Sequence, residues 1–168
     1  METIAWMEKY MTEAENMFYE GRVGDGLTAL NNLLFDEPGY GRLHNHLGWA
    51  YMYYGNDIAR AEMHLKLAIR FSAEYAPPYL HMGNLLNRSG RYTEALEYFR
   101  KGLSKPDVNL IALYEGMAYA YELTGKYASA IRAYKQATRV TTLDFEVDRL
   151  LNSVKRCRKK RIAFFFSF

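Results

Sequence analysis

A period of 34 to 35 residues runs through most of this 168-residue sequence and constrains the fold more than any other feature. Its clearest copies begin at Gly90 and Gly125, and each reads Gly, a basic residue, Tyr, two residues, Ala, three residues and an aromatic residue. The same spacing reaches Gly55 and Gly21 earlier in the chain. Such a period is typical of solenoids built from helix pairs, because each unit buries its apolar face only against its neighbours.

Small residues recur seven positions before each of these glycines, at Ala14, Gly48, Gly83 and Ala118. Two antiparallel helices approach closely only where neither carries a bulky side chain at the crossing. Ala95 and Ala130 supply matching small residues on the second helix of two repeats. We therefore expect tight helix hairpins, in which each first helix ends at a glycine in the left-handed conformation.

The predicted fold class is all-α, a right-handed α-solenoid of antiparallel helix pairs. The pairs are expected at 5–20 with 24–36, 40–54 with 57–71, 76–89 with 92–103, and 109–124 with 127–140. Asp144 begins a further amphipathic helix, which we expect to cap the last repeat and to bury Cys157 as a small hydrophobe. The predicted organisation is four repeats over 1–143, a capping helix with a basic end over 144–161, and an apolar aromatic tail over 162–168.

The segment from His44 to Tyr51 contains a Leu-Gly-x-x-Tyr pattern, and Pro38 and Pro106 follow second helices. Together with the period, this resembles the tetratricopeptide repeat over about residues 7 to 142. The first repeat departs from the pattern, since it lacks the Leu-Gly pair and has Gly26 where Ala is usual. Single-residue insertions near Asn56 and between Lys105 and Leu110 also depart from it.

The resemblance implies a non-enzymatic scaffold or adaptor that binds a peptide segment or a helix of another protein in a concave groove. In this family the first helix of each repeat lines the groove. The positions concerned fall here on Arg42, Asn45, Trp49, Tyr53, Leu80, Asn84, Arg88, Glu115, Tyr119 and Glu122. Three of them, Trp49, Tyr53 and Tyr119, are candidate anchors for a bound segment. The alternative is that these rings pack against neighbouring helices.

We expect no catalytic residue, no cofactor and no metal site. His46 and His81 occupy equivalent positions on adjacent first helices and should approach one another, but no third ligand is evident. No nucleophile motif, phosphate loop or dinucleotide fingerprint is present. No apolar stretch is long enough to insert into a bilayer, and no signal peptide is recognisable, so we expect a cytoplasmic protein.

The net charge of +3 hides a marked asymmetry. Six of the 22 Lys and Arg residues lie within 155–161, which leaves 16 against 19 Asp and Glu in the rest of the chain. An apolar, aromatic end follows this basic run. The candidate residues of the tail are Lys155, Arg156, Arg158, Lys159, Lys160, Arg161, Phe164, Phe165, Phe166 and Phe168.

Three interpretations of this tail compete. It docks on protein, either its own repeats or a second copy in a homo-oligomer, with the acidic body as counter-charge. It attaches to a membrane surface through its cations and phenylalanines. It binds nucleic acid, which ranks last because the basic run is short and the remaining chain is acidic on balance. An extension without function is a fourth interpretation.

Overall fold

The computed structural model describes residues 2–165, and the side chains of residues 5–163. The described residues form nine helices and no strand, and the chain divides into two compact units, Met1–Leu85 and Leu86–Phe168. The first unit holds α1 (Glu2–Tyr19), α2 (Val23–Asp36), α3 (Gly41–Tyr53) and α4 (Ile58–Phe71), and α5 (Pro77–Arg88) begins in it. The second holds α6 (Tyr92–Leu103), α7 (Leu110–Leu123), α8 (Tyr127–Val140) and α9 (Asp144–Phe165).

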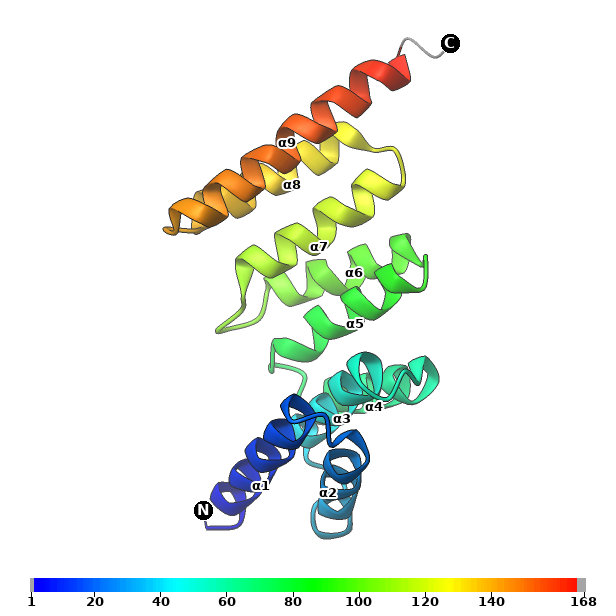
Figure 1. Cartoon of the computed structure of the whole chain (residues 1–168), viewed down its shortest axis with the longest axis vertical. Coiled ribbons are helices and arrows are strands. Elements are labelled where there is room, and N and C mark those ends of the chain that lie inside the picture. The colour runs from blue at the N-terminus through cyan, green and yellow to red at the C-terminus, as the bar shows by residue number, and fades with distance from the viewer. Residues whose placement is uncertain (1, 166–168) are drawn as a thin grey trace. The chain divides into compact units, whose positions relative to one another are not determined.

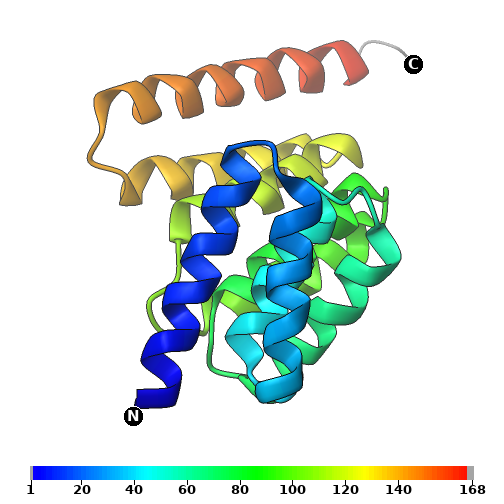
Figure 2. The ribbon, with the colours of Figure 1, turned by 60° about the horizontal axis from the view of Figure 1, so that its bottom comes forward.

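Neighbouring helices pair as the period predicts. In the first unit α1 packs on α2 and α3 on α4, and in the second α7 packs on α8, which α9 then covers (Figure 1). Figure 2 shows α1 and α2, and likewise α8 and α9, running antiparallel through short turns. Every expected boundary from residue 19 to residue 144 agrees with the structure to within one residue. The all-α fold of antiparallel helix pairs is therefore confirmed.

Close helix crossings explain why two positions in the first unit are occupied by glycine. A Cβ atom on Gly48 would lie 2.6 Å from Cγ of Leu65, so α3 and α4 can approach only because position 48 has no side chain. A Cβ atom on Gly26 would lie 2.8 Å from Cε1 of Phe18. Gly26 therefore compensates for the large ring of Phe18 on α1, which accounts for its presence where the family pattern has Ala.

The turns between paired helices use left-handed residues. Gly21, Gly90 and Gly125 have φ of 78°, 74° and 71°, as predicted for glycines that end a first helix. The prediction is wrong at Gly55, because Asn56 takes the left-handed conformation there with φ of 48°. The single inserted residue moves the reversal by one position, and Asn tolerates it better than most residues.

The capping helix begins at Asp144, as expected, and continues past Arg161 to Phe165. Leu150, Val154 and Cys157 are buried along one stripe, so the prediction of a buried Cys157 is confirmed. Burial raises the pKa of the Cys157 thiol to about 11, which leaves little reactive thiolate. Phe166 and Phe168 lie outside the described residues, as do the side chains of Phe164 and Phe165.

Candidate functional site

A polar pocket of about 210 Å³ opens on the first helices of the first unit. It is lined by side chains from α1, α3 and α5, namely Glu15, Tyr19, Asn45, His46, Trp49 and His81. Two of them, Asn45 and Trp49, belong to the predicted groove. The expected approach of His46 and His81 is also found, since both line this pocket.

His46 forms an ion pair with Glu15 at one side of the pocket. Its Nδ1 lies 2.9 Å from the carbonyl oxygen of Arg42, and its Nε2 lies 2.8 Å from Oε1 of Glu15. Both neighbours are acceptors, so both ring nitrogens donate and the ring carries a positive charge. Burial opposes that charge, but the bonds to Glu15 and to the Arg42 carbonyl outweigh it and raise the pKa of His46.

His81, in contrast, is held in the neutral state. Its Nδ1 lies 2.9 Å from Oδ1 of the buried Asn45, to which it donates. Burial and the charged His46 lower the pKa of His81 to about 4, so the ring is neutral at neutral pH. Its Nε2 then carries a lone pair, and no described residue donates a hydrogen bond to it. The pocket thus offers a ring nitrogen as acceptor beside the carboxylate of Glu15.

Trp49 packs against neighbouring rings and also lines the pocket. Its ring contacts those of Phe18 and Tyr54 edge-on, with centroids 5.7 and 5.2 Å away, so it belongs to the packing between α1 and α3. The ring is also half-buried and lines the polar pocket. Tyr53, whose ring lies 6.3 Å from that of Trp49, is 49% exposed, and Tyr19 on the rim is 72% exposed.

The other predicted groove residues of the first unit lie outside the pocket lining. Arg42 donates to Oε1 of Glu8 at 3.2 Å and places its guanidinium 5.2 Å from the centre of the Tyr75 ring. Leu80 and Asn84 are half-buried on α5.

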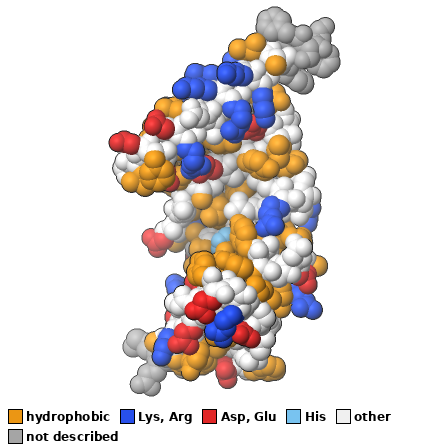
Figure 3. Space-filling model, in the orientation of Figure 1, with side chains coloured by type: hydrophobic (Ala, Val, Ile, Leu, Met, Phe, Trp, Pro, Cys, Tyr) orange, Lys and Arg blue, Asp and Glu red, His pale blue; other side chains and the backbone are white. Residues whose placement is uncertain are grey.

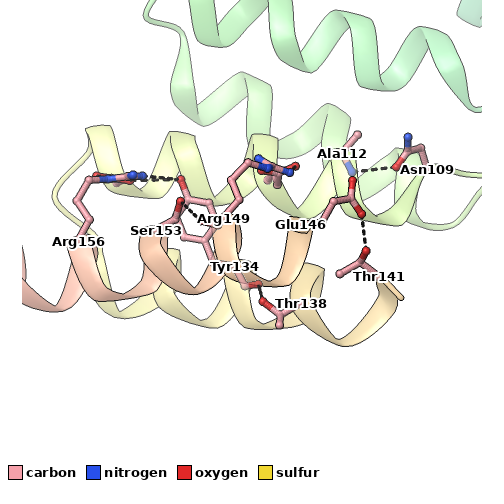
Figure 4. A network of polar contacts seen from close by, with 11 residues as sticks. Asn109, Ala112, Tyr134, Thr138, Thr141, Glu146, Arg149, Ser153 and Arg156 are labelled. Atoms are coloured by element: carbon pink, nitrogen blue, oxygen red, sulfur yellow. Dashed lines mark hydrogen bonds and ion pairs between the residues drawn. The ribbon is translucent and has the colours of Figure 1, made fainter. Parts of the chain in front are cut away.

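In the second unit, the two acidic residues predicted to line a groove form ion pairs with side chains of α9. Both terminal guanidinium nitrogens of Arg149 donate to Glu115, one of them at 2.9 Å. Arg156 donates to the two oxygens of Glu122 at 2.9 and 2.8 Å, and Nζ of Lys160 lies 2.7 Å from Oε1 of the same carboxylate. Figure 4 shows Arg149 and Arg156 projecting from α9 within this network.

Glu122 is therefore a buried anchor for the capping helix instead of an exposed groove residue. Its side chain is 4% exposed, and the hydroxyl of Tyr134 also donates to it at 3.3 Å. The hydrogen bonds from Arg156, followed by those from Lys160, lower the pKa of Glu122 to about 2 despite its burial. Tyr119 remains 48% exposed, and Arg88 is also exposed.

The spacing of residues in the sequence contains a signal for these ion pairs. Glu115 and Arg149 are 34 residues apart, as are Glu122 and Arg156, and as are Glu8 and Arg42 in the first unit. An acid on one first helix thus meets an arginine one repeat later. Because Arg149 and Arg156 lie on α9, this helix occupies the place that the first helix of a next repeat would take.

Replacing Glu122 with Ala is expected to lower the free energy of unfolding of the second unit by about 2 kcal/mol. Loss of one partner of a buried ion pair costs more than this, but Arg156 and Lys160 are half-exposed and can be rehydrated. Urea unfolding followed by circular dichroism measures the loss. Glu115→Ala is the matched control, with an expected loss below about 1 kcal/mol, since that side chain is 26% exposed. Equal losses in the two variants would contradict this assignment.

A larger opening of about 640 Å³ lies between α1 and α2. Its walls are mainly apolar and include Trp6, Tyr10, Met17 and Leu33, with Glu13 as its acidic residue. Within the described residues, no three His, Cys, Asp or Glu side chains gather as a metal site requires. None of the helices in residues 2–165 combines the length and the apolar character of a membrane-spanning helix.

Comparison with known proteins identifies the repeat. Residues 76–104 and 111–141 match the family model of the tetratricopeptide repeat. Two segments of the chain are therefore tetratricopeptide repeats. The first matched segment contains α5 and α6, and the second contains nearly all of α7 together with α8.

Several solved structures share this fold. A MamA protein has 22% sequence identity and a TM-score of 0.68, with 79% of this chain and 71% of that chain covered. A thermophilic TPR protein from Thermus thermophilus has 20% identity and a TM-score of 0.73, with 86% and 79% covered. PilF from Pseudomonas aeruginosa has 15% identity and a TM-score of 0.76, with 93% and 75% covered. None of the curated proteins matches this chain by sequence.

Proposed function

We propose that this protein is a non-enzymatic adaptor that binds a segment of another protein on the first helices of its first unit. The family supports a protein-interaction scaffold in general. The observation that carries the finer proposal is the polar pocket of α1, α3 and α5, with the exposed ring of Tyr19 at its rim. Exposed aromatic side chains beside fixed polar groups are typical of binding hot spots.

The chemistry of the pocket favours a ligand that donates hydrogen bonds. Nε2 of His81 carries a lone pair, and Glu15 presents a carboxylate that His46 holds in place. Trp49 and Tyr19 add aromatic faces, which attract cations. A segment that inserts a Lys or Arg side chain would satisfy these acceptors and contact the aromatic faces. We therefore expect the bound segment to be basic at the residue that enters the pocket.

Selection from a displayed peptide library, followed by calorimetric measurement of the dissociation constant, tests this proposal. Tyr19→Ala is expected to weaken binding of a selected peptide by roughly 10-fold, since exposed aromatic anchors contribute about 1 to 2 kcal/mol or more. Because Tyr19 is 72% exposed, this variant should fold normally.

Phe35→Ala is the matched control, because Phe35 is 87% exposed on α2 and does not line the pocket. Its affinity for the peptide should equal that of the wild type. Equal affinity in Tyr19→Ala, or selected peptides without basic residues, would contradict the proposal.

Self-association through residues 162–168 and a cytoplasmic location stay predictions from the sequence. The apolar opening between α1 and α2 supports the first of them, since it could accept phenylalanine side chains of a second copy. An unchanged mass in light scattering after deletion of 162–168 would count against it.

A further inference from the structure

The cations of α9 divide between two faces of the helix. Arg149, Arg156 and Lys160 lie toward α7 and are bound to Glu115 and Glu122. Their spacing of seven and four residues places them on one side of the helix. These ion pairs, with the buried stripe of α9, hold the helix against the preceding repeat. The remaining cations are thus presented on a helix that is already folded.

The outer face of α9 is defined here as Leu151, Lys155, Arg158, Lys159 and Ile162. Spacings of i, i+4, i+7, i+8 and i+11 place these residues side by side on the helix surface. All five are exposed, with Leu151 at 40% and Ile162 at 56%. Within the described residues, Lys155, Arg158 and Lys159 form no ion pair. Figure 3 shows Lys and Arg side chains gathered over α9.

We propose that the outer face of α9 binds a membrane surface that contains anionic lipid. A helix with exposed aliphatic side chains between lysine and arginine side chains lies in the plane of such a surface, with its cations at the phosphates and its apolar side chains below them. From Asn152 onward the chain contains no acidic residue that would repel the lipid.

The side chains of the outer face favour lipid over nucleic acid. Single-stranded nucleic acid binds where aromatic rings lie beside cations, because each base stacks on a ring. The exposed apolar side chains on either side of these cations are those of Leu151 and Ile162, which can neither stack on a base nor donate a hydrogen bond. Burying them in a bilayer interface is favourable, whereas leaving them against a phosphate backbone is not.

Sedimentation with lipid vesicles tests the proposal with the full chain. One set of vesicles contains phosphatidylcholine alone, and the other contains phosphatidylcholine and phosphatidylserine at a ratio of about 7:3. The wild type should bind the anionic vesicles, and this binding should weaken as salt is added. The triple variant Lys155→Gln, Arg158→Gln and Lys159→Gln should bind them roughly 100-fold less, since each cation near an anionic surface is worth roughly fivefold.

The matched control removes the same charge from elsewhere in the second unit. Lys126, Lys135 and Arg139 are exposed on α8 and the turn before it, and their replacement by Gln should change vesicle binding by less than about threefold, because salt screens charges at a distance. A third variant, Leu151→Ser with Ile162→Ser, should also weaken binding, which a purely electrostatic attraction would not predict. Circular dichroism confirms that each variant is folded.

Several results would overturn the proposal. They are failure of the wild type to bind anionic vesicles, equal binding to neutral vesicles, and equal losses in the outer-face variant and the α8 control. Salt-dependent binding to a single-stranded oligonucleotide without binding to vesicles would assign the outer face to nucleic acid instead. Loss of binding to a peptide selected on the polar pocket bears on the proposed function and leaves this proposal unaffected.

Discussion

Acidification from about pH 7 to about pH 4 is expected to lower the free energy of unfolding of the first unit by about 3 kcal/mol or more. The cause is the buried pair of His44 and His64, which lies between α3 and α4 with 4% and 5% exposure. Burial, then the neighbouring His44, lowers the pKa of His64 from 6.5 to about 4, and burial lowers the pKa of His44 as well. A depression of this size in a buried group corresponds to about 3 kcal/mol.

Hydrogen bonding explains why the pair resists a second positive charge. Nε2 of His44 lies 2.9 Å from the carbonyl oxygen of Pro38, so this nitrogen must donate. In the neutral ring, Nδ1 of His44 is then an acceptor, and Nδ1 of His64 donates to it across 2.9 Å. If both rings were charged, two N–H groups would face each other at this distance. The unfolded chain has no such restriction and takes up both protons.

The sign of the change in stability, and the pH range over which it occurs, follow from these pKa values. Between about pH 6.5 and about pH 4 the unfolded state binds more protons than the folded state, so stability falls as the pH falls. His81 acts in the same direction, since its pKa is also lowered. His46 acts in the opposite direction, because its raised pKa makes its contribution fully present below about pH 6.5. With three rings whose pKa is lowered and one whose pKa is raised, the net effect is destabilising.

The two units allow this effect to be isolated. All four histidines and both tryptophans lie in the first unit, so urea unfolding followed by tryptophan fluorescence reports on that unit. In the second unit, Glu122 loses its contribution only as the pH falls below about 4.5 toward 2. The control is the double variant His44→Leu with His64→Phe, whose stability should vary less with pH by about 3 kcal/mol over the same range. An unchanged pH dependence in this variant would refute the assignment.

Much of the fold could be predicted because the same local pattern of residues recurs in several repeats. Gly90 and Gly125 lie at the same place in two copies, and both end a first helix in the left-handed conformation. Gly48 was predicted to permit a close crossing, and its contact with Leu65 bears this out. Asn56 was not predicted, because the inserted residue beside it has no counterpart in the turns after Gly21, Gly90 and Gly125.

The candidate site was harder to predict. The repeat pattern of the family indicates on which side of a helix a residue lies, but it does not indicate which other segment of the chain covers that side. Glu122 occupies a groove position, yet α9 supplies Arg156 and Lys160 to its carboxylate. The spacing of one repeat between Glu122 and Arg156 contained this information. The polar pocket depends on proton positions in His46 and His81, which only the arrangement of their acceptors determines.

Phe99→Ala is expected to lower the free energy of unfolding of the second unit by about 3 to 5 kcal/mol, the largest effect that we predict for a single substitution. Phe99 on α6 is 0% exposed, and its ring lies against Gly116 on α7. Truncation would remove the ring from the interface between α6 and α7 and leave a cavity there. Urea unfolding followed by circular dichroism measures the loss, and tryptophan fluorescence provides the comparison with the first unit.

The pairing of ring and glycine can be tested apart from simple loss of apolar area. A Cβ atom on Gly116 would lie 2.6 Å from Cε1 of Phe99, so Gly116→Ala should destabilise by about 1 to 2 kcal/mol despite the better helix propensity of Ala. In a Phe99→Leu background the same methyl group has room, and Gly116→Ala should then be neutral or stabilising by up to about 1 kcal/mol. A double-mutant cycle should therefore give a coupling energy of at least about 1 kcal/mol. Additive effects would mean that Phe99 and Gly116 do not fit against each other as described, because two residues in direct contact across a helix interface cannot be changed independently.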